Sequence, residues 1–156
     1  RFDPDVKVTI VDLPGQTAVA EKNAEEAGFK DRITTFAGNI LADSTVLPPE
    51  PDAVWMSQFL DCFSLHQITK ILKKVHSVAT DKTDVYVLEP LWDKQKFEAE
   101  SYSLQATSLY FTCIANGNSK MFHSEDLFHL CEKAGLKIDK VYDGLGKGHS
   151  LIKCVK

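Results

Sequence analysis

The sequence predicts an α/β fold whose mostly parallel sheet ends in an antiparallel hairpin. Short runs rich in β-branched residues alternate with helix-forming segments over most of the 156 residues, and this alternation is typical of a parallel sheet. The last two strand segments are joined only by Gly144–Gly148, with no helix between them. Such a short connection forces antiparallel pairing, because a parallel pairing needs a crossover of a dozen or more residues.

The first part of the chain predicts a strand, a helix and a second strand. Val6–Gly15 contains a Val- and Ile-rich run between two turn signals, which indicates a buried parallel strand. Alanine among Glu and Lys favours a helix over Gln16–Gly28, where glycine ends it. A second strand is predicted over Arg32–Ala37, and the polar, proline-bearing stretch Asp43–Pro51 indicates a loop.

The rest of the chain repeats this order and then changes. Apolar residues at i, i+3 and i+4 spacing predict an amphipathic helix over Leu65–Ala79, with Ser64 as its N-cap. The other predicted elements are strands over Ala53–Gln58 and Asp84–Glu89, a helix over Lys94–Ala115 that lines a pocket, a helix over Ser124–Ala134 capped at Ser124, and the closing strands Leu136–Asp143 and Ser150–Val155.

Composition excludes several classes of function. A net charge of -4 provides no basic stripe, which argues against nucleic acid as the main partner. No apolar run approaches the ~18 residues of a membrane span, so we expect a soluble protein without a membrane partner. Four scattered cysteines lack metal-ligand spacing, which predicts no metal site and suits reduced thiols in the cytoplasm. At this length and 44% hydrophobic content we expect one globular domain.

Asp12 is the first candidate for a binding residue. It follows the first predicted strand directly, and in open parallel sheets an acidic residue at a strand end typically accepts hydrogen bonds from a ribose. The alternative is that Asp12 caps the helix that begins near Gln16. These two interpretations are equally compatible with this feature alone.

Six short motifs occur in order along the chain: Asp12-Leu13-Pro14, Gly38-Asn39-Ile40, the run Met56–Ser64, Val87-Leu88-Glu89, Ala115-Asn116-Gly117 and Ala134-Gly135-Leu136. Together with the terminal hairpin, they resemble the S-adenosylmethionine-dependent small-molecule O-methyltransferases typified by plant phenolic enzymes. The resemblance implies a Rossmann-like class I methyltransferase sheet. It also implies O-methylation of a small aromatic or polyketide-like acceptor, with S-adenosyl-L-methionine as cofactor.

The resemblance also implies a set of cofactor contacts. Asp12 corresponds to the residue that binds the ribose, and Leu13 packs near the adenine. Asn39 stands where the family usually has an Asp at the adenine amino group, and an amide oxygen can accept the same bond. Ile40 lies where an apolar residue faces the adenine ring; for Leu13 and Ile40, core packing is the alternative. Gly38 belongs to the same motif, and Ser57 replaces a cofactor-contacting Lys.

The catalytic positions depart from the family pattern. The family base is a His followed by Asp, and these positions are Asp61 and Cys62 here. Glu89 matches the family Glu that orients the base, whereas a second such Glu falls at Met121. We hypothesise that Asp61 positions or deprotonates an acidic acceptor hydroxyl, with Glu89 as its neighbour. The resemblance places Phe59, Cys62 and Asn116 on the substrate side, and His66 and His123 are interpreted as surface or structural residues.

One expected part of the family fold is missing from the sequence. No strand with a glycine-rich turn precedes Val6, and Gly144–Gly148 leads into no helix. The resemblance implies that the missing strand lies mid-sheet, between the first and third strands of this chain, and that an N-terminal helical domain forms a homodimer. We therefore interpret the chain as a partial catalytic domain, residues 1–156, that binds the cofactor weakly or not at all by itself.

Two other functions remain open at this stage. A nicotinamide-dependent dehydrogenase would also place an acidic residue after a parallel strand, although the terminal hairpin and Gly38-Asn39 argue against it. The second alternative is a non-catalytic domain that kept the fold and acts in assembly with a partner. Loss of catalysis would explain why Ser57, Asp61 and Cys62 depart from the family pattern. A titration with each cofactor distinguishes a dehydrogenase from a methyltransferase. An assay of methyl transfer distinguishes a catalytic domain from a non-catalytic one.

Overall fold

The computed structural model describes residues 3–115 and 117–156 and consists of two compact units, Arg1–Leu47 and Pro48–Lys156. Within the described residues the strands form two separate sheets, one in each unit. Each unit is therefore considered by itself.

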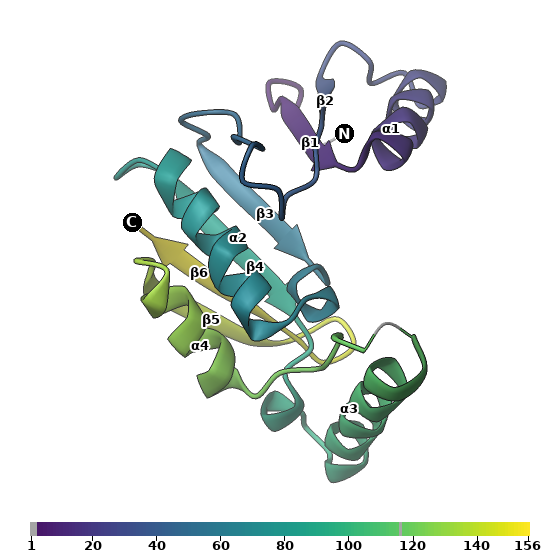
Figure 1. Ribbon diagram of the computed structural model, residues 1–156, viewed down its shortest axis with the longest axis vertical. Coiled ribbons are helices and arrows are strands. Elements are labelled where there is room, and N and C mark those ends of the chain that lie inside the picture. The colour runs from purple at the N-terminus through teal and green to yellow at the C-terminus, as the bar shows by residue number, and fades with distance from the viewer. Residues whose placement is uncertain (1–2, 116) are drawn as a thin grey trace. The chain divides into compact units, whose positions relative to one another are not determined.

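The first unit is a β-α-β segment. Strand β1 (Val8–Asp12) and strand β2 (Ile33–Ala37) pair in parallel, and helix α1 (Pro14–Glu26) connects them (Figure 1). The helix begins two residues before the predicted Gln16, because Pro14 occupies its first turn, where no backbone N–H is needed. The prediction of a buried first strand is wrong: Val8 is 45% exposed, since β1 pairs with β2 along one edge only among the described strands.

The second unit contains a mixed four-stranded sheet in the order β3-β4-β6-β5. Its strands are β3 (Ala53–Ser57), β4 (Asp84–Glu89), β5 (Lys137–Leu145) and β6 (His149–Val155). β3 and β4 are parallel, whereas β6 is antiparallel to both β4 and β5. The antiparallel terminal hairpin is thus confirmed, and β6 runs against the other three strands.

Two helices cover one face of this sheet, α2 (Leu65–Val78) and α4 (Ser124–Lys133) (Figure 1). Alternate residues of β4 are buried, and Val85 and Val87 contribute to the core that the apolar stripe of α2 completes. The core side chains of α2 are Ile68, Ile71, Leu72 and Val75, all nearly inaccessible. Ser64 and Gln67 form the capping box at the start of α2, which confirms the predicted N-cap.

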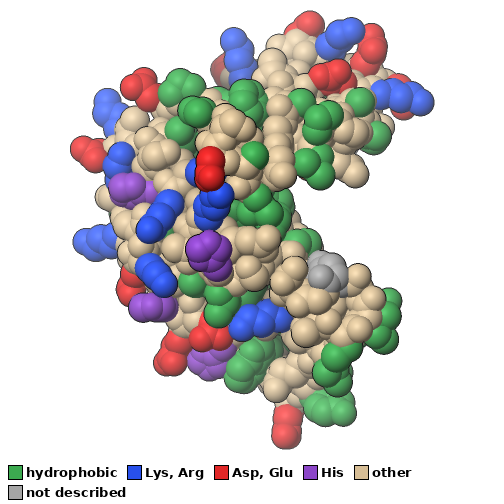
Figure 2. All heavy atoms as spheres, viewed as in Figure 1, with side chains coloured by type: hydrophobic (Ala, Val, Ile, Leu, Met, Phe, Trp, Pro, Cys, Tyr) green, Lys and Arg blue, Asp and Glu red, His purple; other side chains and the backbone are tan. Residues whose placement is uncertain are grey.

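The segment after β4 differs in part from the prediction. A short 3-10 turn, η2 (Trp92–Lys94), is followed by helix α3 (Glu98–Tyr110), which continues as a π-helical turn, η3 (Phe111–Ala115). The helix predicted from Lys94 therefore begins at Glu98. None of its described residues is buried, and apolar side chains lie on the outer surface over α3 (Figure 2). Tyr102 of α3 is 74% exposed, and Ile114 of η3 is 72% exposed.

The start of α4 also corrects a prediction. The N-cap is His123, whose Nδ1 accepts a hydrogen bond from the Glu125 N–H at 3.2 Å. Ser124 is instead buried and bonded to Asp93, through its backbone N–H at 2.7 Å and its hydroxyl at 2.5 Å. Ser124 therefore ties η2 to α4 and does not cap the helix.

Candidate functional site

The predicted site residues lie on both units. Asp12, Leu13, Gly38, Asn39 and Ile40 belong to the first unit, and Ser57, Phe59, Asp61, Cys62 and Glu89 belong to the second. Asn116 lies outside the described residues. The two groups are described separately.

In the first unit, the carboxyl ends of β1 and β2 meet. Asp12 and Ala37 are paired, and the Gly38 N–H donates to the Asp12 carbonyl at 2.9 Å. The Asp12 side chain therefore lies beside the segment that carries Gly38 and Asn39, as the parallel arrangement predicts. A Cβ on Gly38 would lie 3.0 Å from a methyl carbon of Thr45, so the loop closes tightly over this position.

The Asp12 carboxylate does not act as the cap of α1. Leu13 is the N-cap residue and makes no capping bond with its side chain, while Asp12 Oδ1 accepts only the adjacent Leu13 N–H, at 2.7 Å. The carboxylate is exposed and retains acceptor capacity. Leu13 is 51% exposed, so core packing does not explain it, whereas Ile40 is half-buried. Asn39 Oδ1 accepts the Leu41 N–H at 3.0 Å and keeps its amide donor.

In the second unit, a sharp turn carries the chain from β3 to the predicted catalytic residues. Ser57 is the exposed last residue of β3, and Gln58 has a positive φ of 45°. The Gln58 N–H donates to the Leu88 carbonyl at 2.8 Å. This strained conformation turns the backbone into the 3-10 turn η1 (Leu60–Cys62), which contains Asp61.

Glu89, the last residue of β4, binds the backbone of this turn with its side chain. Its Oε1 accepts the backbone N–H groups of Phe59 and Leu60, at 2.9 and 2.8 Å. The side chain is inaccessible to solvent because Glu89 follows Val85 and Val87 on the face covered by helices. Its second oxygen, Oε2, is buried and has no hydrogen-bond partner among the described residues.

Asp61 is presented by a turn that is fixed from two sides. The Lys120 N–H donates to the Asp61 carbonyl at 3.1 Å, and Leu60 beside it is fully buried. The Asp61 side chain is half-buried, and the exposed Cys62 donates its thiol to Asp61 Oδ1 at 3.5 Å. The structure thus brings Asp61, Cys62 and Glu89 together, as predicted.

Burial and mutual repulsion shift the ionisation of this cluster. Burial, followed by the charge of Asp61, raises the pKa of Glu89 to about 7, although the backbone N–H groups of Leu60, Phe59 and Asp61 oppose the shift. Burial also raises the pKa of Asp61, and burial together with the Asp61 charge raises the pKa of Cys62 to about 11. Glu89 can therefore carry a proton near neutral pH, beside the negative charge of Asp61.

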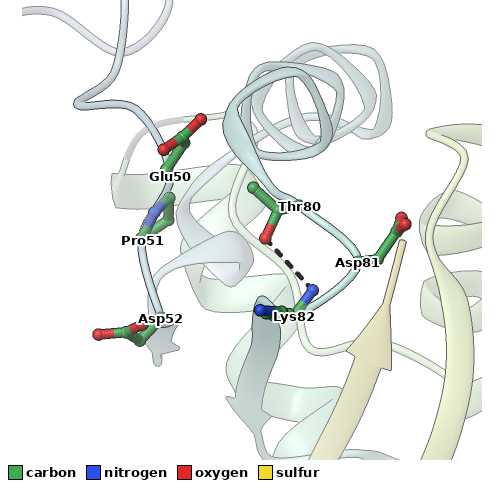
Figure 3. A pocket seen from close by; sticks show the side chains of 6 residues that line it. All are labelled: Glu50, Pro51, Asp52, Thr80, Asp81 and Lys82. Atoms are coloured by element: carbon green, nitrogen blue, oxygen red, sulfur yellow. Dashed lines mark hydrogen bonds between the residues drawn. The ribbon is translucent and has the colours of Figure 1, made fainter.

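Two open hollows lie at opposite ends of the second unit. One, of about 410 Å³, lies where β3 and β4 begin and is lined by Glu50, Pro51, Asp52, Thr80, Asp81 and Lys82 (Figure 3). The other, of about 330 Å³, lies beyond the carboxyl end of β4, and its lining residues are Gln95, Ala99, Glu100, Ser103, Leu104 and Lys147. Part of the predicted pocket helix does line a hollow, at the end of the sheet where ligands bind in parallel α/β folds.

The interpretation of His66 and His123 as surface or structural residues is confirmed. His66 is exposed, and His123 caps α4 and packs against Trp92 with ring centroids 4.7 Å apart. No cluster of three or more potential metal ligands occurs among the described residues. Likewise, no helix in the described ranges is both long and apolar enough to span a membrane.

The chain matches a known family and several solved structures. A sequence profile described as the O-methyltransferase domain matches residues 1–137. A curated relative, 3-hydroxy-5-methyl-1-naphthoate 3-O-methyltransferase of Streptomyces sahachiroi, is 34% identical over 96 residues, which are 62% of this chain and 27% of the relative.

The structural matches show the same fold at low sequence identity. TnmH has a TM-score of 0.84 at 21% identity, covering 97% of this chain and 43% of that one. Mitomycin 7-O-methyltransferase MmcR has a TM-score of 0.83 at 16% identity, covering 98% and 42%. The S-adenosylmethionine-dependent methyltransferase SibL has a TM-score of 0.83 at 23% identity, covering 98% and 44%. The chain thus spans less than half the length of each of these proteins.

Proposed function

Because the chain belongs to the O-methyltransferase domain family, we propose that it is part of an S-adenosylmethionine-dependent enzyme that methylates a hydroxyl group of a small aromatic or polyketide-like compound. The family match over residues 1–137 carries this proposal. The relative from Streptomyces sahachiroi, whose name describes methylation of a hydroxynaphthoate, supports an aromatic acceptor.

The first unit is proposed to hold the nucleoside part of the cofactor. The exposed Asp12 carboxylate can accept hydrogen bonds from two ribose hydroxyls, so its acceptor oxygens fit the nucleoside. Leu13 and Ile40 offer apolar surface to the adenine, and Gly38 keeps the loop close to β1. Asn39 offers the second lone pair of its amide oxygen, which also accepts the Leu41 N–H. Ser57 is the proposed contact from the second unit. When bound, the cofactor supplies a methyl group on a positively charged sulfur, already activated for displacement.

The second unit is proposed to hold the acceptor. Asp61 accepts a hydrogen bond from the acceptor hydroxyl and positions or deprotonates it, with Glu89 as its neighbour. Phe59, Cys62 and Asn116 are proposed substrate contacts, and α3 contributes the hollow beyond β4. Alignment of the acceptor and exclusion of water account for much of the acceleration of such an in-line displacement.

We propose that a further strand, with a glycine-rich turn, completes the parallel sheet in the full-length protein. Among the described strands, β1 pairs only with β2 and β3 pairs only with β4, so each leaves one edge open. A sheet of only two strands, such as β1-β2, is at best marginally stable by itself, which supports a further strand that pairs with it. An N-terminal helical region is proposed to form a homodimer, and we expect the enzyme in the cytoplasm, where its four unpaired thiols stay reduced.

The test uses the full-length protein and two measurements. Calorimetry with S-adenosylmethionine and with NADH identifies the cofactor, and transfer of a labelled methyl group to hydroxynaphthoic acids measures activity. We expect binding of the first cofactor only, loss of that binding in Asp12→Ala, and unchanged binding in Asp139→Asn, a half-exposed control on β5. Binding without methyl transfer to any acceptor would favour a non-catalytic assembly domain, and NADH binding would favour a dehydrogenase.

A further inference from the structure

Gln58 has a backbone conformation that its own side chain makes unfavourable. Its φ is 45°, in the left-handed region, and among the described residues Glu50, with a φ of 51°, is the only other non-glycine residue with a positive φ. The Cβ atom of an L-residue is crowded in this region, so glycine would fit with less strain. Strain that is retained at such a position indicates a use for the side chain.

The fold does not account for the Gln58 side chain. It is exposed, and its amide makes no hydrogen bond to any residue that the structure describes. The bonds that hold this segment come from the backbone instead. The Gln58 N–H donates to the Leu88 carbonyl at 2.8 Å, and the next N–H, that of Phe59, donates to Glu89 at 2.9 Å. Glycine at position 58 would keep both bonds, so folding does not require glutamine.

The position of Gln58 in the second unit points to a ligand. Gln58 directly follows the last residue of β3, at the end of parallel strands beyond which ligands bind. Ser57, before it, is the proposed cofactor contact, whereas Phe59 and Asp61, after it, are proposed to contact the acceptor. Backbone bonds fix residues 58 and 59 in advance, which reduces the entropy lost when a side chain of this turn binds a ligand.

We propose that the Gln58 amide binds the acceptor and selects compounds with a carbonyl or carboxylate oxygen on the ring that carries the hydroxyl group. The amide N–H groups donate to such an oxygen, and Gln58 begins the turn that presents Asp61 to the hydroxyl. The name of the relative from Streptomyces sahachiroi describes a hydroxyl group and a carboxylate on one naphthalene, which agrees with this class. The inference rests on the proposed function and specifies the acceptor within it.

The test compares two probes that differ only in the carboxylate, 3-hydroxy-1-naphthoic acid and 2-naphthol. Their binding to the full-length protein is measured by calorimetry without the cofactor, so it does not depend on methyl transfer. We expect the wild type to bind the acid about tenfold more tightly, because a site built to donate a hydrogen bond discriminates against the compound that lacks the acceptor. Gln58→Gly should bind both probes equally. Gln58→Glu replaces the donor with a negative charge and should prefer 2-naphthol.

Glu50→Gly is the matched control, because Glu50 has nearly the same φ and lies before β3, at the opposite end of the strand. Relief of strain should leave the Tm of both glycine variants no lower than that of the wild type. Only Gln58→Gly should lose the preference for the acid, and Glu50→Gly should keep it.

Three results would overturn the inference: a wild type that does not prefer the acid, a preference that persists in Gln58→Gly, or a lower Tm of Gln58→Gly, which would show that folding needs the side chain. Weaker binding of S-adenosylmethionine in Gln58→Gly, with the preference for the acid retained, would assign the side chain to the cofactor and would also overturn it. If the wild type prefers the acid but methylates neither probe, the proposed function fails, whereas the preference still reports on Gln58.

Discussion

The carboxylate oxygen Oε1 of Glu89 lies 2.8 Å from the backbone nitrogen of Leu60, a residue 29 positions earlier in the chain. This bond joins the carboxyl end of β4 to the turn that follows β3. Because Leu60 is fully buried, its N–H has no access to water and depends on this acceptor. The position of Asp61 in the second unit is therefore determined by a side chain distant in sequence.

Removing the hydrogen-bond acceptor at position 89 should destabilise the fold more than removing only the negative charge of Glu89. Glu89→Ala leaves the buried Leu60 N–H and the Phe59 N–H without their acceptor. We expect its free energy of unfolding, measured with urea, to be about 2 kcal/mol lower than that of Glu89→Gln. Glu89→Gln is the matched comparison because its amide oxygen can take both bonds. Equal stabilities of the two variants at pH 6 would contradict a role for these bonds.

The stability of the chain should fall as pH rises from about 4.5 to about 7. Glu89 has a raised pKa in the folded state, about 7 against 4.5, so across this window the folded state binds more protons than the unfolded state. The difference corresponds to about 3 kcal/mol lost over the window, and to no further change above it. Urea unfolding at several pH values should show this loss in the wild type, and a flatter profile in Glu89→Gln, which lacks the group with the raised pKa.

Local sequence patterns were sufficient for most secondary structure. The apolar spacing of α2 and its Ser64 cap act over a few residues, so the pattern determines them directly. The terminal hairpin follows from its short connection. The predicted N-cap of α4 was wrong because Ser124 bonds to Asp93, 31 residues earlier in the chain. His123 caps the helix instead. No local pattern carries that information.

The candidate site was predictable to a similar extent. The family resemblance implied that Glu89 is a neighbour of Asp61, and in the structure Glu89 bonds the turn that carries Asp61. The turn at Gln58, with its positive φ, and the bond from the Lys120 N–H to Asp61 were missed. Gln is an unexpected residue for a positive φ, and Lys120 is 59 positions away, so neither has a signal in a single sequence.

The contact between Ser124 and Asp93 should stabilise the second unit measurably. Ser124→Ala removes a buried hydroxyl that donates to Asp93 Oδ2 at 2.5 Å, and we expect a loss of about 1–2 kcal/mol in the free energy of unfolding. Ser77→Ala is the control, because the Ser77 hydroxyl is exposed and bonds only within α2, to the Lys74 carbonyl. A control change of less than about 0.5 kcal/mol is expected, and a similar small change in Ser124→Ala would contradict the prediction.

Gly148 should tolerate a side chain less well than its neighbour Gly146. Both have a positive φ, 83° and 56°, so alanine costs about 1–2 kcal/mol at either position through backbone strain. A Cβ on Gly148 would also collide with the Gln95 side chain, whereas nothing lies within 4 Å of one on Gly146. Thermal unfolding should therefore show a larger loss in Gly148→Ala than in Gly146→Ala.

A double-mutant cycle with Gln95 separates the collision from the strain. Gln95 Nε2 donates to the Leu91 carbonyl at 2.6 Å and to the Gly148 carbonyl at 2.8 Å, which ties the hairpin to the segment before α3. Gln95→Ala loses these bonds and should cost about 1–2 kcal/mol. In that background Gly148→Ala should cost only as much as Gly146→Ala, because the colliding side chain has been removed. If the additional cost at Gly148 persists without the Gln95 side chain, the collision is not its cause.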